Sequence, residues 1–152
     1  MRAGTFKVLE NWKIEEVDAY TGEVFSTEEM CNTIVNDGLE RMAKLINNVS
    51  GTYFNSLAIG TGTTGATATD TSLETEYTRA LATLSYEASY KAVFAKTFTF
   101  ASGISEDITE AGIFDNAVVS GSTMLARTTF SAKAVTSAVS LIVTATITIA
   151  RV

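Results

Sequence analysis

The 152-residue sequence contains no histidine, no proline and a single cysteine, Cys31. Without histidine it lacks the usual proton shuttle near neutral pH, and mixed Cys/His metal sites are excluded. No serine has a histidine base to activate it as a nucleophile. One cysteine cannot form a disulfide within the chain, and we expect Cys31 to be a buried thiol, because an unpaired cysteine packs as a small hydrophobic residue.

Positive charge and long hydrophobic runs are also scarce. The chain has 11 Lys and Arg against 17 Asp and Glu, a net charge of −6, and phosphate binding needs clustered bases. All the acids lie in residues 1–115, so residues 116–152 are basic; this asymmetry either steers one subunit onto another or is an ordinary basic segment. Residues 139–150 are apolar but too short and too rich in threonine to span a bilayer, and no signal peptide is evident. We therefore expect neither nucleic acid nor membrane as a partner, and synthesis in a cytoplasm.

What the chain does have is alternation of apolar and polar residues, which predicts β-strands. The predicted strands cover residues 6–14, 86–100, 108–114, 124–130 and 139–149, with a turn at 20–23 and a short return strand at 24–25. Trp12 has the parity of a core-facing position in the first strand. The segment 86–100 is longer than a usual strand, so we expect it to bend or to reach a partner.

Helical spacing appears only around residues 37–47, where Leu39, Met42, Leu45 and Ile46 recur on one face. The start of this helix is ambiguous, because residues 26–29 and 37–40 both have the spacing of a capping box, and residues 27–36 could be helical too. The sequence thus predicts a mainly β fold, an antiparallel, jelly-roll-like β-sandwich with one α-helix. We expect an N-terminal arm or hairpin over residues 1–25 and the sandwich domain over 26–152.

One glycine-rich segment matches a nucleotide-binding pattern letter by letter, namely Gly60-x-Gly62-x-x-Gly65. The pattern binds dinucleotides only where it opens a helix within a βαβ unit, and the residues that follow are poor helix formers. We therefore expect no nucleotide and no other cofactor. The segment is instead predicted to be a flexible, exposed docking loop, with few side chains to anchor it, formed by Gly60, Thr61, Gly62, Thr63, Thr64 and Gly65.

Acidic residues gather in two places, Glu106, Asp107, Glu110 and Asp115, and Asp70, Glu74 and Glu76. Paired carboxylates could cleave glycosides, and carboxylate oxygens could bind Ca²⁺. The simpler interpretation is that these are solvated charges at strand ends and in loops. We expect no catalytic residues, no metal site and no enzymatic activity.

Two longer runs resemble sequences of small virion proteins of tailed phages. Residues 57–64 with 70–76 and Arg79 read LAIGTGTT and DTSLETE followed by R, and residues 108–115 with 124–127 read ITEAGIFD and MLAR, similar to tail-collar-fibre and related virion domains. Residues 32–39, NTIVNDGL, resemble the lead-in found in the same proteins. Within these runs, Glu110 and Arg127 could pair across strands, although an exposed pair would add little stability.

The resemblance implies a non-enzymatic structural protein of a phage virion that self-associates and docks on the particle surface. Its partners would be itself, as a homo-oligomer with a trimer favoured, and other virion proteins, major capsid or tail proteins. Because no repetitive shaft follows the domain, a head decoration protein is favoured over a tail or collar appendage. The alternative is a carbohydrate- or receptor-binding module at a tail tip, for which Trp12, Tyr20, Tyr53 and Tyr77 are the candidate aromatics.

Overall fold

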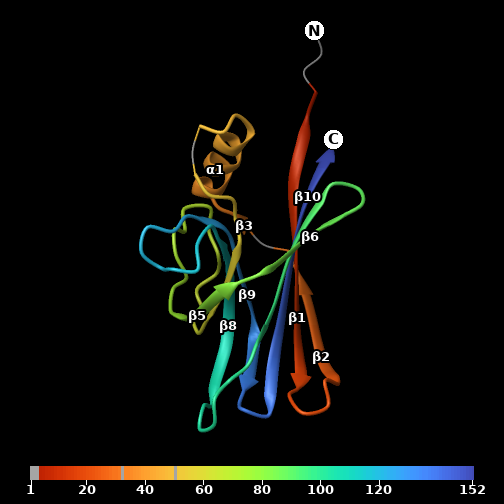
Figure 1. The fold of residues 1–152 in the computed structure, drawn as a ribbon, viewed down its shortest axis with the longest axis vertical. Coiled ribbons are helices and arrows are strands. Elements are labelled where there is room, and N and C mark those ends of the chain that lie inside the picture. Colours follow the sequence, from red (N-terminus) through yellow and green to blue (C-terminus); the bar gives the residue numbers. More distant parts are fainter. Residues whose placement is uncertain (1–3, 32, 50) are drawn as a thin grey trace.

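The computed structural model describes residues 4–31, 33–49 and 51–152. In this part of the chain, ten antiparallel strands form two five-stranded sheets, with one short helix (Figure 1). The expected mainly β sandwich with one helix is therefore confirmed. Residues 1–3 of the predicted arm and Asn32 of the lead-in run lie outside the described residues.

The first sheet, called here the β1 sheet, is built around the two longest strands. Its order is β2 (Val24–Met30), β1 (Phe6–Asp18), β10 (Val139–Arg151), β7 (Lys91–Phe98) and β6 (Thr83–Glu87). Strand β1 pairs with β10 over its full length, and its Trp12 and Ile14 side chains are fully buried in the core. The core position predicted for Trp12 is confirmed. The expected N-terminal hairpin is thus the first hairpin of this sheet, and the proposed boundary at residue 25 falls inside β2.

The second sheet, called here the β8 sheet, is covered on both faces. Its order is β3 (Thr33–Ile34), β9 (Met124–Val135), β8 (Glu106–Phe114), β4 (Ser56–Gly60) and β5 (Glu76–Leu81). Ile113 packs in the main core between the sheets, whereas Phe114 belongs to a smaller cluster with Leu73 and Met124. Leu73 lies in the chain that joins β4 to β5. That connection, residues 61–75, therefore covers the outer face of the β8 sheet.

The predicted long strand over residues 86–100 is wrong, because the chain reverses at Ala88–Tyr90 and forms the hairpin of β6 and β7. Ser89 and Tyr90 adopt φ angles of 73° and 67°. Such angles suit the tight turn of a two-stranded hairpin, but they are normally signalled by Gly or Asn. Neither residue type is present here, so the alternation runs through the turn without a visible break.

Helix α1 spans Asn36–Ile46, in agreement with the helix predicted over 37–47. The alternative extension over 27–36 is wrong, since residues 24–30 pair with β1 as strand β2. Gly38 lets α1 approach β9, because a Cβ there would lie 2.4 Å from the Leu125 carbonyl oxygen. No helix in the described residues has the length and apolar composition needed to cross a membrane.

The structure overturns the expectation that Cys31 is buried, and it shows where the bases of the C-terminal segment lie. Cys31 is exposed, because it follows β2 where the chain crosses from one sheet to the other. The basic C-terminal segment does not form a basic surface patch, since Arg127 and Lys133 are buried in ion pairs with Glu110 and Glu28. The charge asymmetry along the sequence is largely neutralised within the fold.

Candidate functional site

The most densely bonded polar site lies on the outer face of the β8 sheet, beneath the loop formed by residues 61–75. Its centre is the carboxylate of Glu110, which is fully buried. The Glu110 Oε1 atom accepts hydrogen bonds from the backbone amides of Gly62 (3.0 Å) and Thr75 (2.8 Å). The Oε2 atom accepts from the Glu74 amide (3.0 Å). One side chain therefore holds both ends of the loop.

A register shift in β8 brings a second side chain to the same loop. The pairing with β9 is irregular between Ile108 and Glu110. The Thr109 hydroxyl then donates to the Gly62 carbonyl oxygen at 2.8 Å, while Glu110 accepts from the Gly62 amide. Such bulges re-aim side chains, and here two neighbouring residues reach the same loop residue.

Arg127 on β9 connects Glu110 with the middle of the loop, at Thr64 and Asp70. Its Nε atom donates to Glu110 at 2.9 Å, one terminal nitrogen donates to Asp70 at 2.8 Å, and the other donates to the Thr64 carbonyl oxygen at 2.9 Å. Glu110 lies opposite Thr129, so Arg127 reaches it diagonally on the same face. The two residues that the sequence singled out as a cross-strand pair are thus brought together, and the pair is buried rather than exposed.

These contacts show that the loop has many anchors, contrary to the sequence expectation. The anchors come from β8 and β9, far away in the sequence, together with Glu74, which accepts from the Thr64 amide and hydroxyl. We call the set of Glu110, Arg127, Asp70 and Glu74 the loop clamp. It fixes the predicted docking segment, Gly60 to Gly65, in one conformation.

Two carboxylates of the loop clamp, those of Asp70 and Glu74, have pKa values below their ordinary range. Burial raises the pKa of Asp70, but hydrogen bonds from the Thr67 amide and hydroxyl and from Arg127 outweigh it, so the pKa lies below its ordinary value. Hydrogen bonds from Thr64 lower the pKa of Glu74. Burial lowers the pKa of Arg127, and the neighbouring Asp70 and Glu110 carboxylates more than restore it. Asp70 and Glu74 therefore act as fixed anionic acceptors near neutral pH.

Two of the three glycines of the nucleotide-like pattern, Gly60 and Gly62, allow the close packing of the loop clamp. A Cβ at Gly60 would lie 2.3 Å from the Thr75 carbonyl oxygen, and one at Gly62 would lie 2.6 Å from Glu110 Oε1. A Cβ at Gly65 would meet nothing within 4 Å. Neither Gly60 nor Gly62 has a positive φ, so close approach explains both, and the chain after Gly65 continues as a loop and not as a helix.

The two predicted acidic clusters are divided by the structure. Glu106 and Asp107 are exposed at the start of β8, whereas Asp115 forms an ion pair with Arg41 of α1 at 2.5 Å. Glu76 accepts two hydrogen bonds from Arg79, whose guanidinium lies 3.7 Å above the ring of Phe114. Within the residues described, no group of three or more Asp, Glu or Cys residues is placed to hold a metal ion. Sequence reasoning missed Arg41, because nothing in the helix marks it as a partner of a residue so far along the chain.

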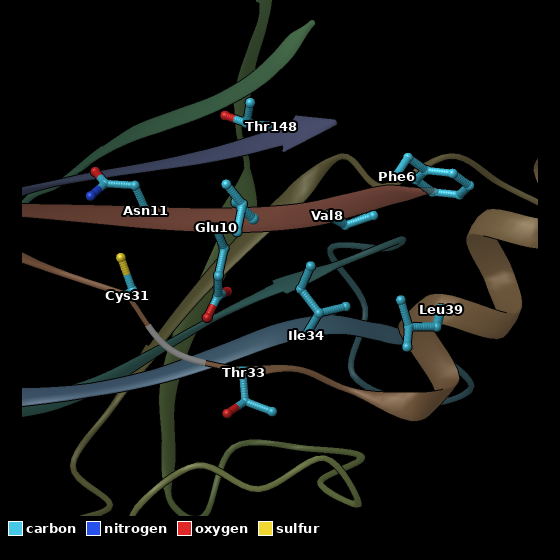
Figure 2. A pocket seen from close by; sticks show the side chains of 10 residues that line it. Phe6, Val8, Glu10, Asn11, Cys31, Thr33, Ile34, Leu39 and Thr148 are labelled. Carbon is cyan, nitrogen blue, oxygen red and sulfur yellow. The ribbon is translucent and has the colours of Figure 1, made fainter. Parts of the chain in front are cut away.

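A second surface feature is a pair of clefts beside α1. One, of about 760 Å³, lies between β1 and the β3–α1 segment (Figure 2). Its lining is apolar at Phe6, Val8, Ile34 and Leu39 and polar at Glu10, Asn11 and Thr33. The other, of about 370 Å³, lies between α1 and the strands β6, β7 and β10. Both clefts are open to solvent, and α1 lines each of them, through Leu39 in the first and Met42 in the second.

The two phage-like runs meet at the polar site. All seven charged residues within them form ion pairs. Four of these residues, Asp70, Glu74, Glu110 and Arg127, make up the loop clamp, whereas Glu76 pairs with Arg79 and Asp115 pairs with Arg41 of α1. Comparison with family models, curated proteins and solved structures finds no match to the chain.

Proposed function

We propose that this chain is a non-enzymatic structural protein of a tailed-phage virion, which self-associates and docks on other virion proteins. The observation that supports this most is the loop clamp, since its four residues, Asp70, Glu74, Glu110 and Arg127, all belong to the phage-like runs and fix the 61–75 loop. In these runs the charged side chains are engaged in holding the fold together. A structural role accounts for that use of charge better than a chemical one.

A fixed loop suits docking for a thermodynamic reason. Binding costs free energy when a mobile segment must be ordered, and a segment that is already ordered avoids that cost. Thr63 and Thr71 of this loop are exposed, and such side chains fit a polar contact with a capsid or tail protein. The net charge of −6 would keep unassembled subunits soluble and away from DNA.

Head decoration is the position we favour, with a tail or collar appendage second. The described residues form a compact sandwich without an elongated shaft, which suits a subunit that bridges neighbours on a preformed lattice. The receptor-binding alternative is less well supported, because Trp12 is fully buried. The exposed Tyr20 and Tyr53 lie in separate connections, one between β1 and β2 and the other before β4.

The test is to measure the protein in purified particles of the phage that encodes it. Trypsin cleaves after Lys and Arg and should release the peptides over residues 80–91 and 128–133. Quantitative mass spectrometry of these peptides against a major capsid peptide gives the copy number. Hundreds of copies support head decoration, a dozen or fewer support a tail or collar position, and absence from washed particles overturns the proposal.

A further inference from the structure

The inner face of the β1 sheet continues beyond the part that the β8 sheet covers. Alternate residues of β1 face inward, and their exposure rises from Trp12 and Glu10, which are buried, through the half-buried Val8 to Phe6, which is 63% exposed. Strand β10 shows the same change from Ala145 to Ile149. Beyond the Glu10 carboxylate, which accepts from the Trp12 indole, the inward positions are apolar at Val8, Phe6 and Ile149 although their cover has ended, which is unusual for a surface facing only water.

Helix α1 covers this overhanging face only in part. One of the clefts described above lies between β1 and the start of the helix (Figure 2). The other lies between the helix and the strands β6, β7 and β10. Both described chain ends and α1 lie at this end of the sandwich (Figure 1). We call this surface, formed by residues 4–10, 36–49, 86–92 and 147–152, the α1 end.

We infer that the α1 end is the surface through which copies of this chain associate, each copy presenting the same end. The inference rests on the self-association in the proposed function and assigns its location. The occupant of the clefts is thus the α1 end of a second copy.

Charge is the first reason for choosing another copy as the occupant. The α1 end holds five bases and four acids, whereas the rest of the chain holds six bases and thirteen acids. Two copies of a chain with net charge −6 repel each other over most of their surface. They can approach most easily through the one end that is nearly neutral, because like charges placed opposite each other oppose association.

The exposed apolar area is the second reason. Phe6, Tyr86 and Tyr90 are 63%, 70% and 65% exposed. An aromatic side chain can bury about 150–250 Å², so these three offer roughly 300–500 Å². A stable interface needs about 800 Å² from each partner. The exposed aliphatic side chains of the α1 end supply the remainder: Leu39, Ile46, Val49, Ile149 and Val152.

The test compares two double variants by analytical ultracentrifugation of the full chain. Phe6→Ser with Ile46→Lys alters the α1 end at sites that are 63% and 86% exposed. The matched control, Phe25→Ser with Tyr20→Lys, makes the same kinds of change at sites that are 55% and 81% exposed, in and before β2. We expect the wild type and the control to be oligomeric at micromolar concentration. The α1-end variant should dissociate, with its dissociation constant raised at least tenfold.

Each other result has a distinct meaning. If the α1-end variant stays as oligomeric as the control, the assignment of the surface is overturned while self-association stands. A monomeric wild type overturns self-association and this inference together, but the particle measurement still decides the virion role. Circular dichroism checks folding. If the double variant unfolds, Ile46→Lys alone decides, because lysine is favourable in the last turn of an exposed helix.

Discussion

Replacing Glu110 by glutamine tests whether the loop clamp holds the β8 sheet and its covering loop together. In the wild type the carboxylate accepts hydrogen bonds from three loop amides and from Arg127. An amide side chain of the same shape has only one acceptor oxygen. Its NH₂ group would face N–H donors, and Arg127 would lose one of its buried anionic partners.

The magnitude follows from the burial of both side chains. Glu110 is fully buried and Arg127 is 2% exposed, so solvent screens the pair weakly. Removing one partner of a buried pair costs about 3–5 kcal/mol, because the other charge stays buried. We expect Glu110→Gln to lower the free energy of unfolding by about that amount. For a domain of this size, this lowers the melting temperature by roughly 6–20 °C.

The assay is urea unfolding followed by tryptophan fluorescence, since Trp12 is the only tryptophan and lies in the core. Glu106→Gln is the control, because it makes the same change on the same strand at an exposed position. Hydrogen exchange at the Gly62 and Thr75 amides should also accelerate in Glu110→Gln. A loss below about 1 kcal/mol, equal to that of the control and with unchanged exchange, would refute the clamp.

Three further predictions concern the same loop. Gly62→Ala should lower the urea midpoint because its Cβ would lie 2.5 Å from the Glu74 Cβ, whereas Gly65→Ala, with open space around it, should leave the midpoint unchanged; equal midpoints would contradict this. Folding lowers the pKa of Asp70, so ionised Asp70 stabilises the folded state at pH values above its ordinary pKa of 3.8. This stabilisation is lost as the pH falls through the lower pKa of the folded state. Melting temperatures between pH 6 and pH 2.5 should therefore fall less steeply for Asp70→Asn, and parallel curves would count against the Arg127 contact. Adding ATP or NAD should leave the melting temperature unchanged, and a concentration-dependent rise would show that the native state binds the nucleotide.

The sequence predicts the sandwich because alternation is a local property of each strand. The segments around Trp12, Ile113 and Val143 each show it, and each became a strand with its apolar face in the core. Local helix propensity gave the wrong secondary structure where a contact with a distant part of the chain determines it. Residues 27–30 have helix-forming side chains, yet Glu28 pairs with Lys133 of β9 and the segment is strand β2.

The candidate site was predictable only in part. Glu110 and Arg127 were predicted to pair. Their burial was not predicted, because they are covered by the 61–75 loop, whose sequence is typical of a flexible segment. The acid that completes the site, Asp70, stood out only as one of several acids. Its partner could not be chosen from the sequence, since Arg127 reaches it only after β4, β8 and β9 have been placed side by side.

The pairing of β1 with β10 has a consequence for the order in which the chain can fold. The hairpin of β1 and β2 is local and can form early, but β1 lies between β2 and β10 in its sheet. The second edge of β1 is paired, and Trp12 gains its cross-strand neighbour Ala145, only when the last strand, β10, is in place. Pairings between such distant segments are slow to form, because a large loop must close before any contact stabilises it. Folding should therefore be completed late and cooperatively, with closure of the β1 sheet as its slow step.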